Sequence, residues 1–101
     1  MKIALRKPLT WEEKTYQEPN LDLDGLRGKD LLAVGAELRA SGARDVVQGE
    51  TDDRYLSAVA AKAAKVDRDV IAALFAADFI RVRAEVQSFL LGTSDKEPES
   101  T

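Results

Sequence analysis

The stretch that decides the fold runs from Thr51 to Gly92 and reads TDDRYLSAVAAKAAKVDRDVIAALFAADFIRVRAEVQSFLLG. Its apolar residues recur every three or four positions, which is the spacing of one face of an α-helix. Its side chains do not form a pattern that indicates a catalysed reaction. The stretch therefore predicts helices that pack against one another.

Three helices are predicted within this stretch, each with its own start signal. Thr51 is an N-cap candidate for the first helix, Asp67 for a short second helix, and Asp78 marks the start of a third helix that also takes in residues 76–77. Gly92 ends the third helix, since glycine favours the position just after a helix.

The inward faces of these helices follow from the same spacing. The small and apolar residues predicted to face inward are Leu56, Val59, Ala60 and Ala63, then Val70, Ile71 and Leu74, then Phe79, Val82, Val86, Phe89 and Leu90. The alanines would let another helix approach closely. Phe79 and Phe89 are the largest of these residues in the third helix, and we expect both to be buried.

Before this stretch, the sequence predicts a small amount of sheet and one more helix. Residues 2–6 alternate charged and apolar side chains, as a half-buried strand does. Residues 12–14 separate two segments rich in threonine and aromatic residues, which predicts a hairpin. Trp11 and Tyr16 would form a cross-strand pair, which is the commoner arrangement, or an exposed binding surface. Pro19 lacks an N–H for a ladder, so the returning strand is an edge strand or is broken nearby.

From Gly28 the apolar spacing becomes helical. Leu31, Val34 and Leu38 share one stripe, so a helix is predicted over about residues 29–41, with Gly42 as its C-cap. The predicted fold class is α+β and mainly α, with an N-terminal β-hairpin followed by about four packed helices. Residues 1–92 form one predicted domain, and the acidic tail of residues 93–101, which has no apolar side chain, is predicted to be disordered.

Composition narrows the functional classes. The chain of 101 residues contains neither cysteine nor histidine, which removes thiol and imidazole catalysis and the usual zinc sites. A net charge of -3 disfavours nucleic acid as a partner. No apolar run approaches the roughly 20 residues that span a bilayer, and the first residues do not resemble a secretory signal. We expect a cytoplasmic protein without a membrane partner.

Two acidic patterns have plain structural explanations. Residues 20–25 read NLDLDG and imitate the first half of a calcium-binding EF-hand loop, but the twelfth position is Leu31, which has no carboxylate. A polar turn is the better interpretation. The acid pairs at residues 52–53 and 67–69 lie where helix N-termini favour negative charge, so capping accounts for them.

The segment from Ala61 to Leu74 also has the spacing of a helix-turn-helix motif. Lys65, however, occupies the position where the turn usually has glycine, and Arg68 lies between Asp67 and Asp69. Two acids facing phosphates would repel them. Packing of a helix pair is therefore favoured, and a small DNA-binding regulator remains the alternative function.

The order of landmarks resembles the tail assembly chaperone family of contractile-tailed, Mu-like bacteriophages and their prophages. The segments that carry this resemblance are residues 3–9 (IALRKPL), 26–32 (LRGKDLL), 55–63 (YLSAVAAKA) and 78–90 (DFIRVRAEVQSFL). The sequence departs from the family at residues 12–14, where a glycine-bearing turn is expected, and in its acidic tail.

The resemblance implies a non-enzymatic protein without a cofactor that binds the helical tape measure protein and keeps it soluble until tail tube subunits polymerise around it. It also implies action in the bacterial host cytoplasm, absence from the mature virion, and often a longer frameshifted form of the same protein. Homo-oligomers are a further possibility, and a generic oligomeric structural protein is a competing class.

Apolar residues left over after the core is filled are the candidates for partner binding. Ile80 and Leu91 fall off the stripe of Phe79 and Phe89, and Phe75 adjoins Leu74 at the junction of two helices. The predicted partner-binding residues are Leu74, Phe75, Ile80 and Leu91.

Overall fold

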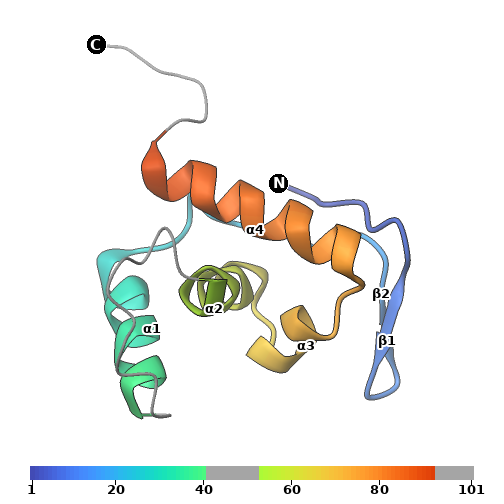
Figure 1. Cartoon of the computed structure of the whole chain (residues 1–101), viewed down its shortest axis with the longest axis horizontal. Coiled ribbons are helices and arrows are strands. Elements are labelled where there is room, and N and C mark those ends of the chain that lie inside the picture. The colour runs from blue at the N-terminus through green and yellow to red at the C-terminus, as the bar shows by residue number, and fades with distance from the viewer. Residues whose placement is uncertain (41–52, 93–101) are drawn as a thin grey trace.

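The computed structural model describes residues 1–40 and 53–92, and it has the predicted α+β class. A hairpin of β1 (Leu9–Trp11) and β2 (Lys14–Tyr16) precedes four helices: α1 (Gly28–Ala40), α2 (Asp53–Ala64), α3 (Arg68–Ala72) and α4 (Ala76–Leu91). α2 lies at the centre with α1 and α3 on either side of it, and α4 crosses over it (Figure 1). The hairpin lies at the end of the molecule where α4 begins.

The hairpin turn contains two residues and not the three predicted, because Lys14 already belongs to β2. Glu12 and Glu13 both have positive φ angles, 47° and 70°, as a two-residue turn of type I′ requires. Trp11 pairs with Lys14, and Tyr16 pairs with Leu9. The two aromatic residues are therefore diagonal cross-strand neighbours on one face of the hairpin, where both pack against the core.

Residues 2–6 have the predicted alternating exposure and run antiparallel to residues 17–21, but they do not form the regular strand that was predicted. The N–H of Ile3 donates to the carbonyl of Pro19 at 3.0 Å, and the N–H of Leu5 donates to the carbonyl of Gln17 at 2.8 Å. Between these two segments, Lys2 and Asn20 form an isolated β-bridge, and the remaining pairing is irregular. Pro19 fits here because the pairing uses its carbonyl group and needs no N–H from it.

Helix α1 begins one residue earlier than predicted, at Gly28. The carboxylate of Asp30 accepts the N–H of Arg27 at 2.9 Å, which satisfies a backbone donor at the start of the helix. Val34 and Leu38 are buried, and Leu31 packs beside them, so the predicted stripe is correct. The predicted caps Gly42 and Thr51 and the predicted disordered tail lie outside the described residues.

The turn between α2 and α3 is a Schellman motif built around a lysine. Lys65 has a φ of 59°, its N–H donates to the carbonyl of Lys62, and the N–H of Val66 donates to the carbonyl of Ala61. Asp67 then caps α3 as predicted, since its carboxylate accepts the N–H of Asp69 at 3.0 Å.

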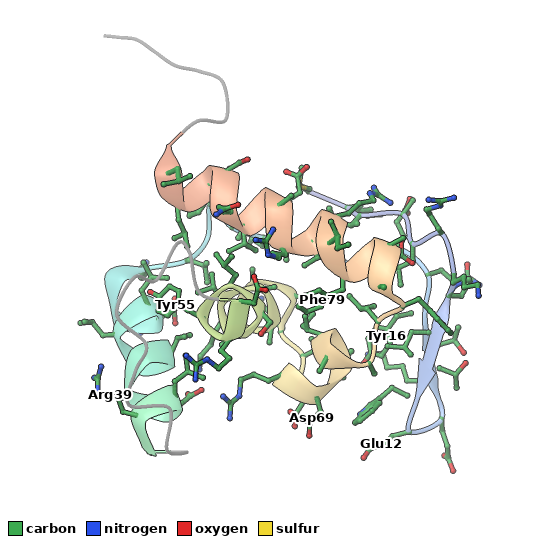
Figure 2. The ribbon with its side chains drawn as sticks, viewed as in Figure 1. Glu12, Tyr16, Arg39, Tyr55, Asp69 and Phe79 are labelled. Carbon is green, nitrogen blue, oxygen red and sulfur yellow. The ribbon has the colours of Figure 1, made fainter. Side chains whose placement is uncertain are left out.

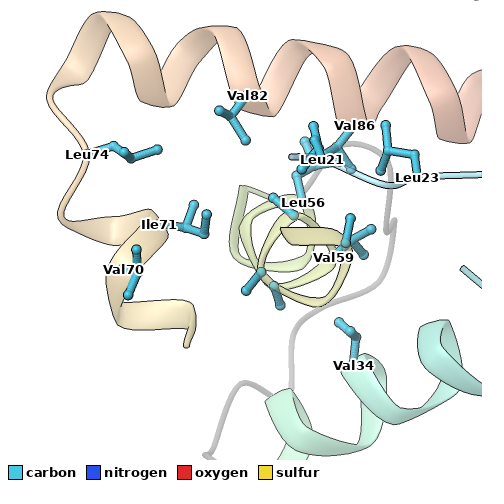
Figure 3. Packing of buried hydrophobic residues seen from close by; sticks show 14 of the residues in the cluster. Leu21, Leu23, Val34, Leu56, Val59, Val70, Ile71, Leu74, Val82 and Val86 are labelled. Carbon is cyan, nitrogen blue, oxygen red and sulfur yellow. The ribbon is translucent and has the colours of Figure 1, made fainter. Parts of the chain in front are cut away.

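The hydrophobic core surrounds α2, which buries residues on most of its circumference. Its buried residues are Leu56, Ala58, Val59, Ala60, Ala61 and Ala63. Figure 3 shows Val34 of α1 on one side of α2, Ile71 of α3 on the other, and Val82 and Val86 of α4 across the top. Small side chains on α2 allow this close approach from several directions. The segment that carries Leu21 and Leu23 closes the same cluster.

Helix α4 includes residues 76–77 as predicted, but its N-cap residue and the depth of its aromatic residues differ from the prediction. It begins at Ala76, Phe75 occupies the N-cap position without a side-chain hydrogen bond, and Asp78 lies within the first turn. Val82 and Val86 are buried, whereas Phe79 and Phe89 are only partly buried and cover the edge of the core. Figure 2 places Phe79 on the side of α4 that faces α2 and α3. Gly92 ends the helix with a φ of 71°, as predicted.

Within residues 1–40 and 53–92, none of the helices has the length and apolar character needed to cross a membrane.

Candidate partner-binding surface

The structure separates the predicted partner-binding residues into two groups. Phe75, Ile80 and Leu91 are exposed, with 47%, 58% and 54% of their surface accessible. Leu74 is only 8% accessible and belongs to the core with Ile71. Leu74 was predicted both as an inward-facing residue and as a partner-binding residue. Its burial confirms the first prediction and makes the second wrong, because the side chain is not available to a partner.

Ile80 and Leu91 lie on the same face of α4. They are eleven positions apart in one helix, and at 100° per residue this separation leaves them about 20° apart around the axis. The exposed residues Ala77 and Ala84 occupy the same side. We call Ala76, Ala77, Ile80, Ala84 and Leu91 the outer face of α4. It lies opposite the buried residues of the helix, and its alanines leave room for another chain to approach closely.

A buried aspartate joins the start of α4 to the N-terminal segment. Asp78 is fully buried, and its two carboxylate oxygens accept the N–H groups of Arg6 at 2.9 Å and Lys7 at 3.1 Å. The guanidinium of Arg81 lies 3.9 Å from the same carboxylate and also donates to the carbonyl of Ala4. The hydrogen bond from Arg6 is the largest of the effects that lower the pKa of Asp78, and together they outweigh the opposing effect of burial.

This connection creates a groove beside the start of α4. The groove has a volume of about 490 Å³ and is lined by Arg6, Lys7, Phe75, Ala76, Ala77 and Asp78. The ammonium of Lys7 lies 4.7 Å from the centre of the Phe75 ring, a cation–π contact that holds both side chains at its rim. We call it the cationic groove. It adjoins the outer face of α4, because the two alanines belong to both and Ile80 follows within one turn.

The acidic segment of residues 20–25 has a local structural role. In residues 20–25 the carboxylate of Asp22 accepts the N–H of Gly25 at 3.2 Å, and a side chain added at Gly25 would meet Asp22 at 2.5 Å. The segment is thus a tight polar turn. Across the part of the chain that the structure describes, no three residues of types His, Cys, Asp or Glu gather as metal ligands would.

The α2–α3 pair has the turn that the helix-turn-helix spacing suggested, but α3 contains only five residues. Asp67, Arg68 and Asp69 are all exposed at its start. Figure 2 shows Asp69 on the side of α3 away from α4. Two carboxylates beside one guanidinium make this end unfavourable for phosphate contacts.

Three features of this surface were not predicted from the sequence. Leu32 on α1 is the most exposed large apolar residue described, at 76%, and its position off the stripe of Leu31, Val34 and Leu38 signalled this. Asp78 precedes Val82 and Val86 at spacings of four, so an acid on a buried stripe signalled a partnered carboxylate. The groove residues Arg6 and Lys7 carry no comparable signal, because their partner is 71 or more positions away.

In comparisons with known proteins, no protein-family model, no curated protein and no solved structure matches the chain.

Proposed function

We propose that this protein is a tail assembly chaperone of a contractile-tailed, Mu-like phage or prophage. It binds helical segments of the tape measure protein in the host cytoplasm and keeps them soluble until tail tube subunits assemble around them. In this proposal it is not an enzyme, it requires no cofactor, and it leaves before the virion is complete.

The observation that carries the proposal is the outer face of α4. A helix whose inner side already fills the core has no structural need for Ile80 and Leu91 on its outside, and exposing both to water is unfavourable. Apolar residues spaced along one helix face match the way in which amphipathic helices bind one another. Phe75 extends this apolar surface at the start of the helix.

Co-expression with the tape measure protein tests the proposal. The tape measure protein is expected to remain soluble when the chain is present and to aggregate without it. The double variant Phe75→Asp with Ile80→Asp should abolish this protection, since it places two charges on the proposed surface. Its circular dichroism spectrum should remain that of the parent, because both side chains are exposed.

The matched control is Leu32→Asp with Ala36→Asp, which adds the same charge to exposed positions on α1. This variant should protect the tape measure protein as well as the parent does. Equal solubility of the tape measure protein with and without the chain would refute the chaperone function. Equal loss of protection in both double variants would refute the assignment to α4.

A further inference from the structure

We infer that the cationic groove binds an acidic segment of the partner chain, in which carboxylates lie next to an apolar residue. The inference rests on the proposed function and specifies the chemistry of one part of the recognised partner. The carboxylates would pair with the side chains of Arg6 and Lys7, while the apolar residue would contact Phe75 and its neighbouring alanines.

The charge of the groove supports an acidic occupant. The chain as a whole carries a net charge of -3, yet both exposed charges at the rim, those of Arg6 and Lys7, are positive. The one carboxylate in the lining is that of Asp78, which is buried and already accepts two backbone N–H groups. It is therefore engaged within the protein, whereas the two cations face solvent.

The backbone contacts also fix where these cations lie. Asp78 binds the main-chain N–H groups of Arg6 and Lys7, so both side chains leave the groove wall from a constrained backbone. Lys7 is held further by the ring of Phe75. Constraining a binding residue before the partner arrives lowers the entropy that binding must remove.

The lining favours an acidic protein segment over a polyphosphate. Half of the lining residues are Phe75, Ala76 and Ala77, which offer apolar contact and no hydrogen-bonding side chain. The exposed apolar face of α4 continues from these residues, as a bound polypeptide would require. A nucleic acid would instead meet the net negative charge of the remaining surface.

A titration with synthetic peptides tests the inference. The probes are an acidic peptide with Leu-Glu-Asp-Leu-Glu at its centre, its uncharged counterpart with Leu-Gln-Asn-Leu-Gln, and inorganic phosphate. Each is added to the isotope-labelled full chain, and backbone amide shifts are followed by NMR. The acidic peptide should shift the amides of residues 6–7 and 75–78, with an affinity about tenfold or more above that of the uncharged peptide, and the difference should shrink in high salt.

Variants that retain the backbone contacts of Asp78 distinguish the effect of the two groove cations from the effect of the net charge of the chain. Arg6→Gln with Lys7→Gln removes both cations while leaving the backbone N–H groups of these residues for Asp78. This variant should bind the acidic peptide about tenfold or more weakly than the parent does. The control Lys2→Gln with Lys29→Gln removes the same charge from exposed positions elsewhere and should leave the affinity within about twofold. The exchange Arg6→Lys with Lys7→Arg should restore most of the binding.

Several outcomes would overturn the inference. The first is equal affinity of the chain for the charged and uncharged peptides. The second is an equal loss of affinity for the acidic peptide in the groove variant and the control variant. The third is that phosphate produces the same amide shifts as the acidic peptide at the same concentration. The groove variant is also co-expressed with the tape measure protein. If it still protects that protein while Phe75→Asp with Ile80→Asp does not, the chaperone proposal stands and the groove inference fails. Peptide binding at the groove without any protection by the parent chain would support the groove as a binding site and refute the chaperone function.

Discussion

Asp78 links two parts of the chain that are far apart in sequence. Its carboxylate receives the N–H groups of Arg6 and Lys7 where the pairing of the N-terminal segment stops, so these donors are satisfied although they have no strand partner. A buried carboxylate is stable only when hydrogen bonds or charges compensate for its lost hydration. Here the compensation comes from backbone groups and Arg81, and the same contacts shape the cationic groove.

Replacing Asp78 with asparagine is expected to destabilise the protein at neutral pH. One oxygen acceptor becomes an amide donor, which cannot accept the second N–H. Because the pKa of Asp78 is lowered in the folded state, its stabilisation is present above the unfolded pKa of about 4 and is lost as pH falls through the folded value. Thermal unfolding measured from pH 7 downwards should show a lower Tm for Asp78→Asn than for the parent. The difference between the two Tm values should become smaller below about pH 4.

The control for this prediction is Asp24→Asn, at an exposed position in the loop before α1. Its Tm should follow that of the parent across the whole pH range. A gap for Asp78→Asn that stays constant as the solution becomes acidic would show that the contribution of this side chain does not depend on its charge.

Among the elements, the hairpin carries the clearest local strain. A type I′ turn places both central residues in the left-handed region, which costs roughly 1–2 kcal/mol for each residue with a side chain. Asparagine and glycine are the residues that favour this turn, but here Glu12 and Glu13 occupy it. The pairing of β1 and β2 and the contacts of Trp11 and Tyr16 with the core must hold the turn in place.

Replacing the turn with Asn-Gly is expected to stabilise the protein. Glu12→Asn with Glu13→Gly should raise the free energy of unfolding by about 1–2 kcal/mol, because both residues adopt positive φ more readily. Urea denaturation measures this change. Glu12→Gln with Glu13→Gln removes the same charges without relieving the backbone, so it should give less than half of the gain. An equal gain in both variants would assign the effect to charge repulsion.

In the whole molecule, α2 holds the other helices together. It packs against α1, α3 and α4, and charged pairs reinforce two of these contacts: Lys62 with Glu37 of α1 at 3.1 Å, and Asp53 with Arg83 of α4. Both pairs are substantially exposed, and such pairs contribute little to stability. The apolar contacts of Leu56 and Val59, which have no accessible surface, therefore dominate.

A pair of Leu→Ala substitutions tests this arrangement. Leu56→Ala is expected to lower the free energy of unfolding by about 2–5 kcal/mol, since it leaves a cavity at the centre of the core. Leu32→Ala removes the same atoms from an exposed position and should change it by less than about 0.5 kcal/mol. Chemical denaturation of both variants gives the comparison. Similar losses in the two would mean that α2 is not the centre of the core.

Much of the candidate surface could be identified from the sequence, because it depends on helical spacing. Once α4 is oriented by Val82 and Val86, Ile80 and Leu91 must point outward, and both do. The same spacing placed Leu74 among the inward residues with Val70 and Ile71, and its burial confirms that placement, so only its second assignment as a partner-binding residue was wrong. The cationic groove could not be predicted from the sequence, because it joins residues 6–7 to residues 75–78, which lie far apart in the chain.

The sequence by itself determined the α+β class, the four helices and the capping roles of Asp67 and Gly92, since each depends on neighbours a few positions away. Only the tertiary structure decided that Asp78 is buried beneath the N-terminal segment and that Phe79 and Phe89 lie at the edge of the core. Apolar spacing shows which side of a helix faces inward, but the depth of burial depends on which other segments cover that side. Covering segments are brought together by packing across the whole chain, and local sequence does not encode their positions.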